Sequence, residues 1–190
     1  MTTAASDYFT ATMPEPWQIL GLRLRPFSLG HYKLLKRHGC AFVSDSEQSA
    51  TRADLLLGVL CCSMPVEEFE QFIEQPDFQE QIKSWGNTIG LFDLNSRAEM
   101  FKQYIEQQSQ VPKYWEEKEG GVSGAHWAHC LEVTLRAELG WTAQDLNTQP
   151  LSKAFADYFK HAENQGMVKL MTPEEIAFIE SQKKEVACGS

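Results

Sequence analysis

The residues best suited to chemistry form one short cluster of possible transition-metal ligands. His126, His129 and Cys130 are spaced so that a helix would place all three side chains on one face. Zinc accepts these ligand types, but a structural zinc site needs four ligands, and no Cys-x-x-Cys or His-Glu-x-x-His spacing supplies the rest. A fourth would have to come from Cys61, Cys62 or His161. The incomplete set favours a polar helix start with a buried thiol, so we predict no bound metal.

The same helix face also offers a thiol and an imidazole for nucleophilic catalysis. His126 and Cys130 would lie one turn apart, yet no neighbouring residue clearly orients the imidazole as a catalytic base. A structural role for Cys130 is therefore favoured. A metal- or thiol-dependent enzyme that uses the His126, His129 and Cys130 face remains the alternative from another class of function.

Other motifs of possible chemical use are weaker. The glycine-rich segment 120–124 precedes a predicted helix, where backbone N–H groups can hold a phosphate. It lacks the Walker lysine and the dinucleotide glycine spacing, so a flexible connection is favoured. Neighbouring carboxylates point apart on helices and indicate solvated faces or helix-start charges; these are Glu67-Glu68, Glu116-Glu117 and Glu174-Glu175. The sequence thus predicts no catalytic residue, no cofactor and no enzyme.

Charges are segregated along the chain. Residues 23–37 hold five basic and no acidic side chains, whereas residues 67–80 hold only acidic charges. Such a pattern would suit head-to-tail self-association or the steering of a charged partner, if the fold turned it into two faces. Ordinary solvated faces are the more frequent explanation of charge runs.

Helical periodicity dominates the segments that must position these residues, and it predicts about seven or eight helices. They are expected over 29–38, 51–64, 65–74, 78–85, from 95, over 124–139, from 150 to about 165, and from 173. Ser28 and Ser123 are the predicted caps of two of them, Gly86-Asn87 a break, and Gly140 and Gly166 stops. Residues 168–171 are predicted to be extended, and residues 116–124 to form a loop. Thr172-Pro173-Glu174-Glu175 is a capping box for the last helix.

The N-terminal segment differs from the rest. Alternation in Leu22-Arg23-Leu24-Arg25 predicts a short strand or hairpin. We therefore predict a mainly α, single multi-helix globular domain over 26–185, preceded by an extended or hairpin arm over 1–25. In a binding protein this arm would supply apolar anchors and charge; the candidate partner-binding residues are Trp17, Ile19, Leu22, Arg23, Arg25, Lys33, Lys36 and Arg37.

Composition limits the classes of function. The chain has 190 residues, 43% of them hydrophobic, which is typical of a globular domain with one core. Its formal charge of −9 disfavours general binding to nucleic acid or anionic membranes, although a nucleic-acid module using the basic arm is a third hypothesis. The five cysteines, without a signal segment or an apolar run of about 18 residues, predict reduced thiols, no membrane span and a cytoplasmic location.

Part of the chain resembles a known family. Leu139-Gly140-Trp141-Thr142 is followed by Asp145, Asn147 and Pro150-Leu151, then by a helix through Tyr158-Phe159 and Ala162-Glu163 to Gly166. With these motifs, the C-terminal half is similar to small helical proteins of tailed-phage and prophage tail modules, especially tail assembly chaperones. The segment 20–31 resembles the openings of small prophage-encoded proteins. Together these segments cover about a third of the chain.

The resemblance implies a non-enzymatic protein. Members of such families coat or shield a long helical tape measure protein during tail assembly, often beside a longer product made by ribosomal frameshifting. The implied partners are a tape measure or other tail protein, or further copies of the chain, in the cytoplasm of the host cell. It supplies no catalytic residue.

Overall fold

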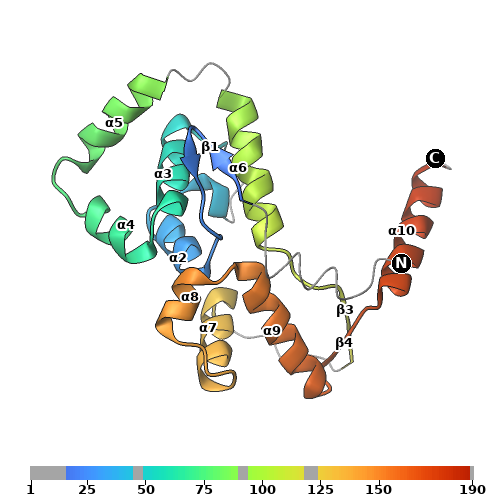
Figure 1. Cartoon of the computed structure of the whole chain (residues 1–190). Helices are drawn as coiled ribbons and strands as arrows, with labels where there is room; N and C mark the ends of the chain where they lie inside the picture. Colours follow the sequence, from blue (N-terminus) through green and yellow to red (C-terminus); the bar gives the residue numbers. More distant parts are fainter. Residues whose placement is uncertain (1–15, 45–48, 90–93, 118–123, 189–190) are drawn as a thin grey trace.

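The computed structural model describes residues 16–44, 49–89, 94–117 and 124–188 (Figure 1). Within these ranges the chain is mainly helical and forms a single domain, as predicted. Its helices are α2 (Leu29–Arg37), η1 (Ala41–Val43), α3 (Arg52–Ser63), α4 (Val66–Ile73), α5 (Phe78–Ile89), α6 (Leu94–Gln108), α7 (Trp127–Ala137), α8 (Ala143–Thr148), α9 (Leu151–Asn164) and α10 (Pro173–Cys188). Its strands are β1 (Gln18–Ile19), β2 (Leu22–Arg23), β3 (Tyr114–Glu116) and β4 (Val168–Leu170).

Helix α3 lies at the centre of the core. It packs against α2, α4, α6 and the β1–β2 hairpin, and its Leu55, Val59, Cys61 and Cys62 side chains are buried. The helix is apolar nearly all round, which fits its place in the core, because neighbours cover it on several sides. A glycine, Gly58, lets the ring of Phe101 from α6 approach the helix closely; a Cβ at this position would lie 2.5 Å from the ring.

Local signals start and stop several helices as predicted. The Ser28 hydroxyl caps α2 in a capping box that His31 completes, and the Thr172–Glu175 pair does the same for α10. Gly140 and Gly166 both adopt positive φ, of 70° and 64°, after α7 and α9. Only glycine reaches this region at little cost, which explains why these helices end there.

Two predicted boundaries are wrong. Helix α5 runs through Gly86, because this glycine is buried beside Leu56 and its carbonyl oxygen accepts a hydrogen bond from Arg52. Helix α7 begins at Trp127 rather than at residue 124, and His126 is its N-cap. The predicted cap Ser123 and most of the predicted loop over 116–124 lie outside the described residues.

A second two-stranded sheet lies at the lower end of the body and leads into α10, which projects from it (Figure 1). Strand β4 confirms the predicted extended segment, and it pairs antiparallel with β3, a strand that the sequence pattern did not predict. The Tyr114 ring lies 4.5 Å from that of Phe159, so one face of the ribbon packs on α9. Ion pairs Lys113–Glu180 and Lys169–Glu175 connect the strands to α10. None of the helices in the described part is long and apolar enough to cross a lipid bilayer.

Candidate partner-binding site

The predicted arm is a hairpin attached to the core. Leu20 and Gly21 form its turn, and their φ values of 52° and 78° are those of the turns that suit twisted two-residue hairpins. Past the hairpin, the Leu24 amide donates to the Trp17 carbonyl oxygen, and the Arg25 amide donates to the Cys62 carbonyl oxygen, each at 2.8 Å. The second of these bonds joins the segment to the end of α3. Residues 1–15 of the predicted arm lie outside the described residues.

The hairpin contributes side chains to the core, which changes the list of candidate anchors. Ile19 is fully buried and Leu24 is 5% exposed. Ile19 is therefore a core residue whose side chain has no exposed surface for a partner, because β1 lies against α6, which the residue pattern alone could not show. Trp17 and Leu22 are half-buried and keep part of their apolar surface accessible.

Trp17 is held in place from α6. Its Nε1 donates a 2.7 Å hydrogen bond to Oε1 of Gln107, and its ring meets the ring of Tyr104 edge-on at 6.2 Å. A fixed aromatic ring loses little conformational entropy when a partner covers it. Trp17 is thus the better positioned of the two remaining apolar candidates.

The structure separates the five basic candidates into two groups. Lys33 forms an ion pair with Glu132 at 2.8 Å, Arg37 forms one with Glu70 at 3.3 Å, and Lys36 Nζ donates to the Val43 carbonyl oxygen. Arg23 and Arg25 are exposed, and neither has an ion pair with any described residue. These two charges are therefore the part of the basic run that no ion pair in the described part neutralises, although Arg25 lies near enough to Glu67 to help lower the pKa of that carboxyl.

The acidic run does not form a separate face opposite the basic one. Helices α2 and α4 pack against one another, and the Arg37–Glu70 pair joins the two runs. Glu67 accepts hydrogen bonds from the Asn147 side chain and from its own backbone amide, and these hold the pKa of its carboxyl below the usual range. Partial neutralisation between neighbouring helices weakens the hypothesis of two oppositely charged faces.

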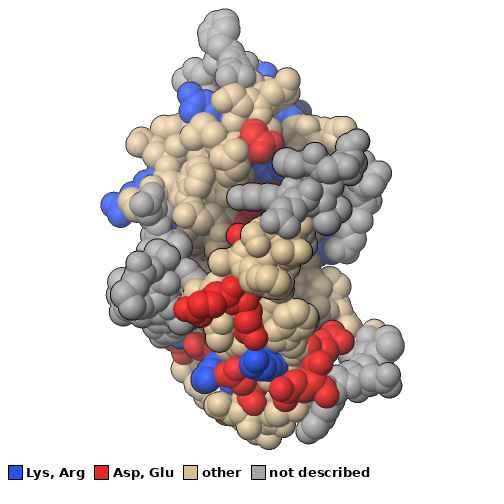
Figure 2. Space-filling model, turned by 90° about the vertical axis from the view of Figure 1, so that its right-hand side faces the viewer, with Lys and Arg blue, Asp and Glu red and all other residues tan. Residues whose placement is uncertain are grey.

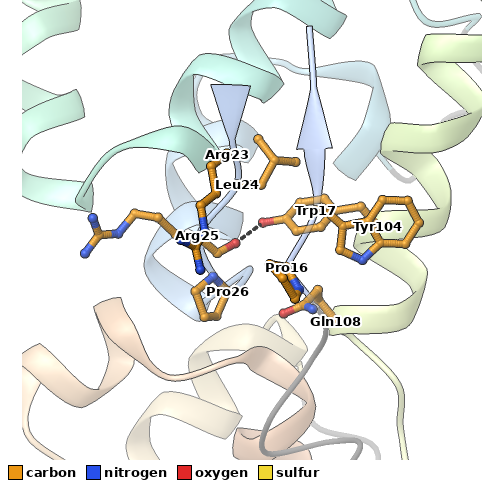
Figure 3. Close-up of a pocket in the computed structure, with 8 residues that line it drawn as sticks. All are labelled: Pro16, Trp17, Arg23, Leu24, Arg25, Pro26, Tyr104 and Gln108. Atoms are coloured by element: carbon orange, nitrogen blue, oxygen red, sulfur yellow. Dashed lines mark hydrogen bonds between the residues drawn. The ribbon is translucent and has the colours of Figure 1, made fainter. Parts of the chain in front are cut away.

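A pocket of about 170 Å³ lies where the hairpin meets α6 (Figure 3). The rings of Trp17 and Tyr104 lie on one side of it, and the arginines on the other, with Gln108 at its base. The Tyr104 hydroxyl donates a 2.7 Å hydrogen bond to the Arg25 carbonyl oxygen, and burial raises the pKa of this phenol well above its ordinary value, so it stays protonated. The lining residues are Pro16, Trp17, Arg23, Leu24, Arg25, Pro26, Tyr104 and Gln108.

Gln108 is a pocket residue that the sequence analysis missed. Its side chain is 1% exposed, and its Oε1 accepts a hydrogen bond from the Phe27 amide at 3.3 Å. The sequence does contain one indication that Gln108 is buried, because position 108 continues the apolar stripe of Phe101 and Tyr104 along α6. A polar residue in such a stripe indicates a buried hydrogen bond.

The predicted chemical cluster is used structurally. His126 Nδ1 accepts a hydrogen bond from the Ala128 amide as the N-cap of α7, and its Nε2 lies 3.4 Å from the Tyr32 hydroxyl. His129 is exposed. No group of three or more His, Cys, Asp or Glu side chains among the described residues could hold a metal ion, so none of the suggested fourth ligands joins the cluster.

The buried cysteines are poor nucleophiles. Burial raises the pKa of the Cys40 thiol to about 12 and that of Cys61 well above its ordinary value. The thiolate, which is the reactive species, is therefore almost absent at neutral pH. Cys61 and Cys62 serve as small core side chains.

The far end of the molecule has a different charge. Figure 2 shows the face on the right-hand side of Figure 1. Acidic side chains gather around a few basic ones at its lower end, where Figure 1 places α9 and the β3–β4 ribbon. Two of the cations of this region, Lys160 and Lys169, are already paired with Glu163 and Glu175. An acidic partner would be repelled from this end and attracted to the hairpin.

The site therefore combines a fixed aromatic ring, two available arginines and a small pocket, an arrangement suited to binding rather than to covalent chemistry. Comparison of the chain with protein-family models, with curated protein sequences and with solved structures yields no match.

Proposed function

We propose that this protein is a non-enzymatic tail-module protein of phage or prophage origin, acting as an assembly chaperone or small structural component in the host cytoplasm. It binds a helical partner, such as a tape measure protein, or further copies of itself. The resemblance of residues 139–166 and 20–31 to tail-module proteins supports this proposal. So does the use of His126 and the buried cysteines in capping and packing rather than at a reactive centre.

The observation that carries the proposal is the hairpin surface, defined as Trp17, Leu22, Arg23 and Arg25. It places partly accessible apolar side chains next to two arginines that form no ion pair with any described residue. Interfaces are enriched in Trp and Arg, which combine large contact area with directed hydrogen bonds. Since the hairpin is attached to α3 and α6, binding need not order it first.

Charge reversal at the hairpin tests the proposal. In Arg23→Glu/Arg25→Glu, association with the partner should slow by roughly tenfold or more at low salt, because steering by charge is lost. The matched control is Lys83→Glu/Lys160→Glu, which makes the same change of net charge on α5 and α9. Circular dichroism should show unchanged helix content for both variants.

The partner is sought directly by co-purification with phage tail-module proteins such as a tape measure protein, with light scattering to measure self-association. A deletion of residues 1–15 keeps every buried side chain of the described part, whereas a deletion reaching residue 25 would remove Ile19 and Leu24 from the core. If the intact protein stays monomeric and captures none of these proteins, the proposed function is wrong.

A further inference from the structure

The pocket beside the hairpin contains a hydrogen-bond donor that has no acceptor among the described residues. Gln108 uses Oε1 to accept from the Phe27 amide, which fixes the orientation of the carboxamide and directs Nε2 elsewhere. Nε2 has no hydrogen-bond partner among the described residues, although the side chain is 99% buried. Because no fully enclosed side-chain nitrogen or oxygen in the described part lacks a partner, this nitrogen must open onto the pocket.

The other polar side chains around the pocket are donors as well. Arg23 and Arg25 line it and have no ion pair within the described part, and none of its described lining residues carries a carboxylate. The hydroxyl hydrogen of Tyr104 is already used by the Arg25 carbonyl oxygen. A site lined by donors with positive charge nearby selects a group that only accepts hydrogen bonds and is negatively charged.

Size and wall chemistry narrow the choice further. A volume of about 170 Å³ is below the roughly 300–1,000 Å³ of typical small-molecule sites, so the pocket fits a single side chain rather than a metabolite. Its remaining walls are Pro16, Trp17, Leu24 and Pro26, which favour a ligand with an apolar stem. A carboxylate on a short aliphatic stem meets both conditions, whereas a phosphate lacks the stem.

We infer that this pocket receives a glutamate or aspartate side chain of the protein partner, with its carboxylate held by Gln108 Nε2 and Arg23 and its stem against Trp17. The inference rests on the proposed function for the source of the carboxylate. The chemistry of the pocket, in contrast, depends only on the residues that line it. The two are tested separately.

The pocket is probed with glutamate whose amino and α-carboxyl groups are blocked, added to the ¹⁵N-labelled full chain. The Gln108 side-chain amide and the Trp17 indole resonances should shift and saturate, with an apparent Kd on the order of 1 mM, as expected for a single side chain. Blocked glutamine, which replaces one acceptor oxygen by a donor, should bind at least tenfold more weakly. Inorganic phosphate is the third probe and should also bind at least tenfold more weakly.

Two substitutions on α6 provide the matched pair. Gln108→Glu keeps an oxygen that accepts from the Phe27 amide but replaces the donor that faces the pocket by a negative oxygen, and it should weaken blocked-glutamate binding at least tenfold. Gln103→Glu makes the same change on the exposed side of the same helix and does not line the pocket. It should leave the affinity unchanged. Arg23→Met should also weaken binding at least tenfold, and thermal unfolding checks that each variant is folded.

The possible outcomes separate the two proposals. Absence of saturable shifts with blocked glutamate, or equal or tighter binding of phosphate, would overturn the assignment of a carboxylate pocket. Capture of a tail protein that Gln108→Glu does not weaken would overturn the use of the pocket by the partner. Binding of blocked glutamate without capture of any tail protein would support the pocket chemistry and reject the proposed function.

Discussion

The Tyr104 hydroxyl of α6 donates a 2.7 Å hydrogen bond to the carbonyl oxygen of Arg25, 79 residues earlier in the chain. This bond connects the end of the hairpin segment to the longest helix beside it, in a place where Tyr104 is 1% exposed. The contact positions the backbone on which both arginines lie. Tyr104 therefore belongs both to the core of the fold and to the candidate site.

Tyr104→Phe should lower the free energy of unfolding by about 1–2 kcal/mol. The ring and its contacts with Trp17 and Phe27 remain, but the buried Arg25 carbonyl oxygen loses its donor. Urea denaturation measures the change. A midpoint and slope equal to those of the wild type would show that this hydrogen bond contributes nothing to stability.

His31 should make the fold sensitive to mild acid. Burial, with the charge of Arg25, lowers the pKa of its imidazole from 6.5 to about 4, although its bond with the Met64 carbonyl oxygen and the charge of Glu67 act in the opposite direction. Between pH 6.5 and about 4 the unfolded chain binds a proton on this imidazole that the folded chain does not. The free energy of unfolding is therefore unaffected by the protonation of His31 above pH 6.5 and decreases as the pH falls towards 4. The full decrease in the free energy of unfolding from this group is about 3 kcal/mol.

This dependence is measured by urea denaturation of the wild type and of His31→Gln at pH 7 and pH 4.5. The wild type should lose roughly 2–3 kcal/mol more than the variant over this interval. Carboxyl groups such as that of Asp145, whose pKa is lowered by its hydrogen bonds with Thr142, affect both proteins and cancel in the difference. Parallel losses in the two proteins would argue against a neutral buried His31.

Two phenylalanines should differ in their contribution to stability. Phe101 is fully buried between Phe42 and Tyr104, so Phe101→Ala should cost roughly 3–5 kcal/mol through the cavity it leaves. Phe155 is central to the most regular apolar stripe of the sequence, but it is half-buried and contacts Trp127. Phe155→Ala should therefore cost less, roughly 1–2 kcal/mol. Equal losses in urea denaturation would contradict this ranking.

The cluster of His126, His129 and Cys130 should bind no metal ion. We expect the purified protein to contain no stoichiometric zinc and to keep its unfolding temperature in excess chelator. His126→Ala combined with Cys130→Ser should cost about 1 kcal/mol, because His126 caps α7. One zinc per chain by elemental analysis, lost together with stability on chelation, would revive the enzyme alternative.

Helix existence and several helix ends follow from the sequence, because the interactions that decide them are local. Ser28 and the Thr172–Glu175 pair satisfy amides within the first turn of their own helices, and Gly140 provides a positive φ three residues after the helix that it ends. The apolar periodicity of α3 and α4 likewise needs only the next few residues to be recognised. These elements could be predicted without knowing what packs on them.

The remaining features depend on contacts between distant parts of the chain. Gly86 stays helical because Leu56 and Arg52 of α3 cover it, which overrides its low helix propensity. Strand β3 exists through its pairing with β4, about fifty residues later in the chain, and its three residues have no clear pattern of their own. The burial of Ile19 and the open donor of Gln108 are likewise set by the packing of the hairpin on α3 and α6. Residue types suggested a binding arm, but only tertiary packing decided which of its side chains enter the core and which stay exposed.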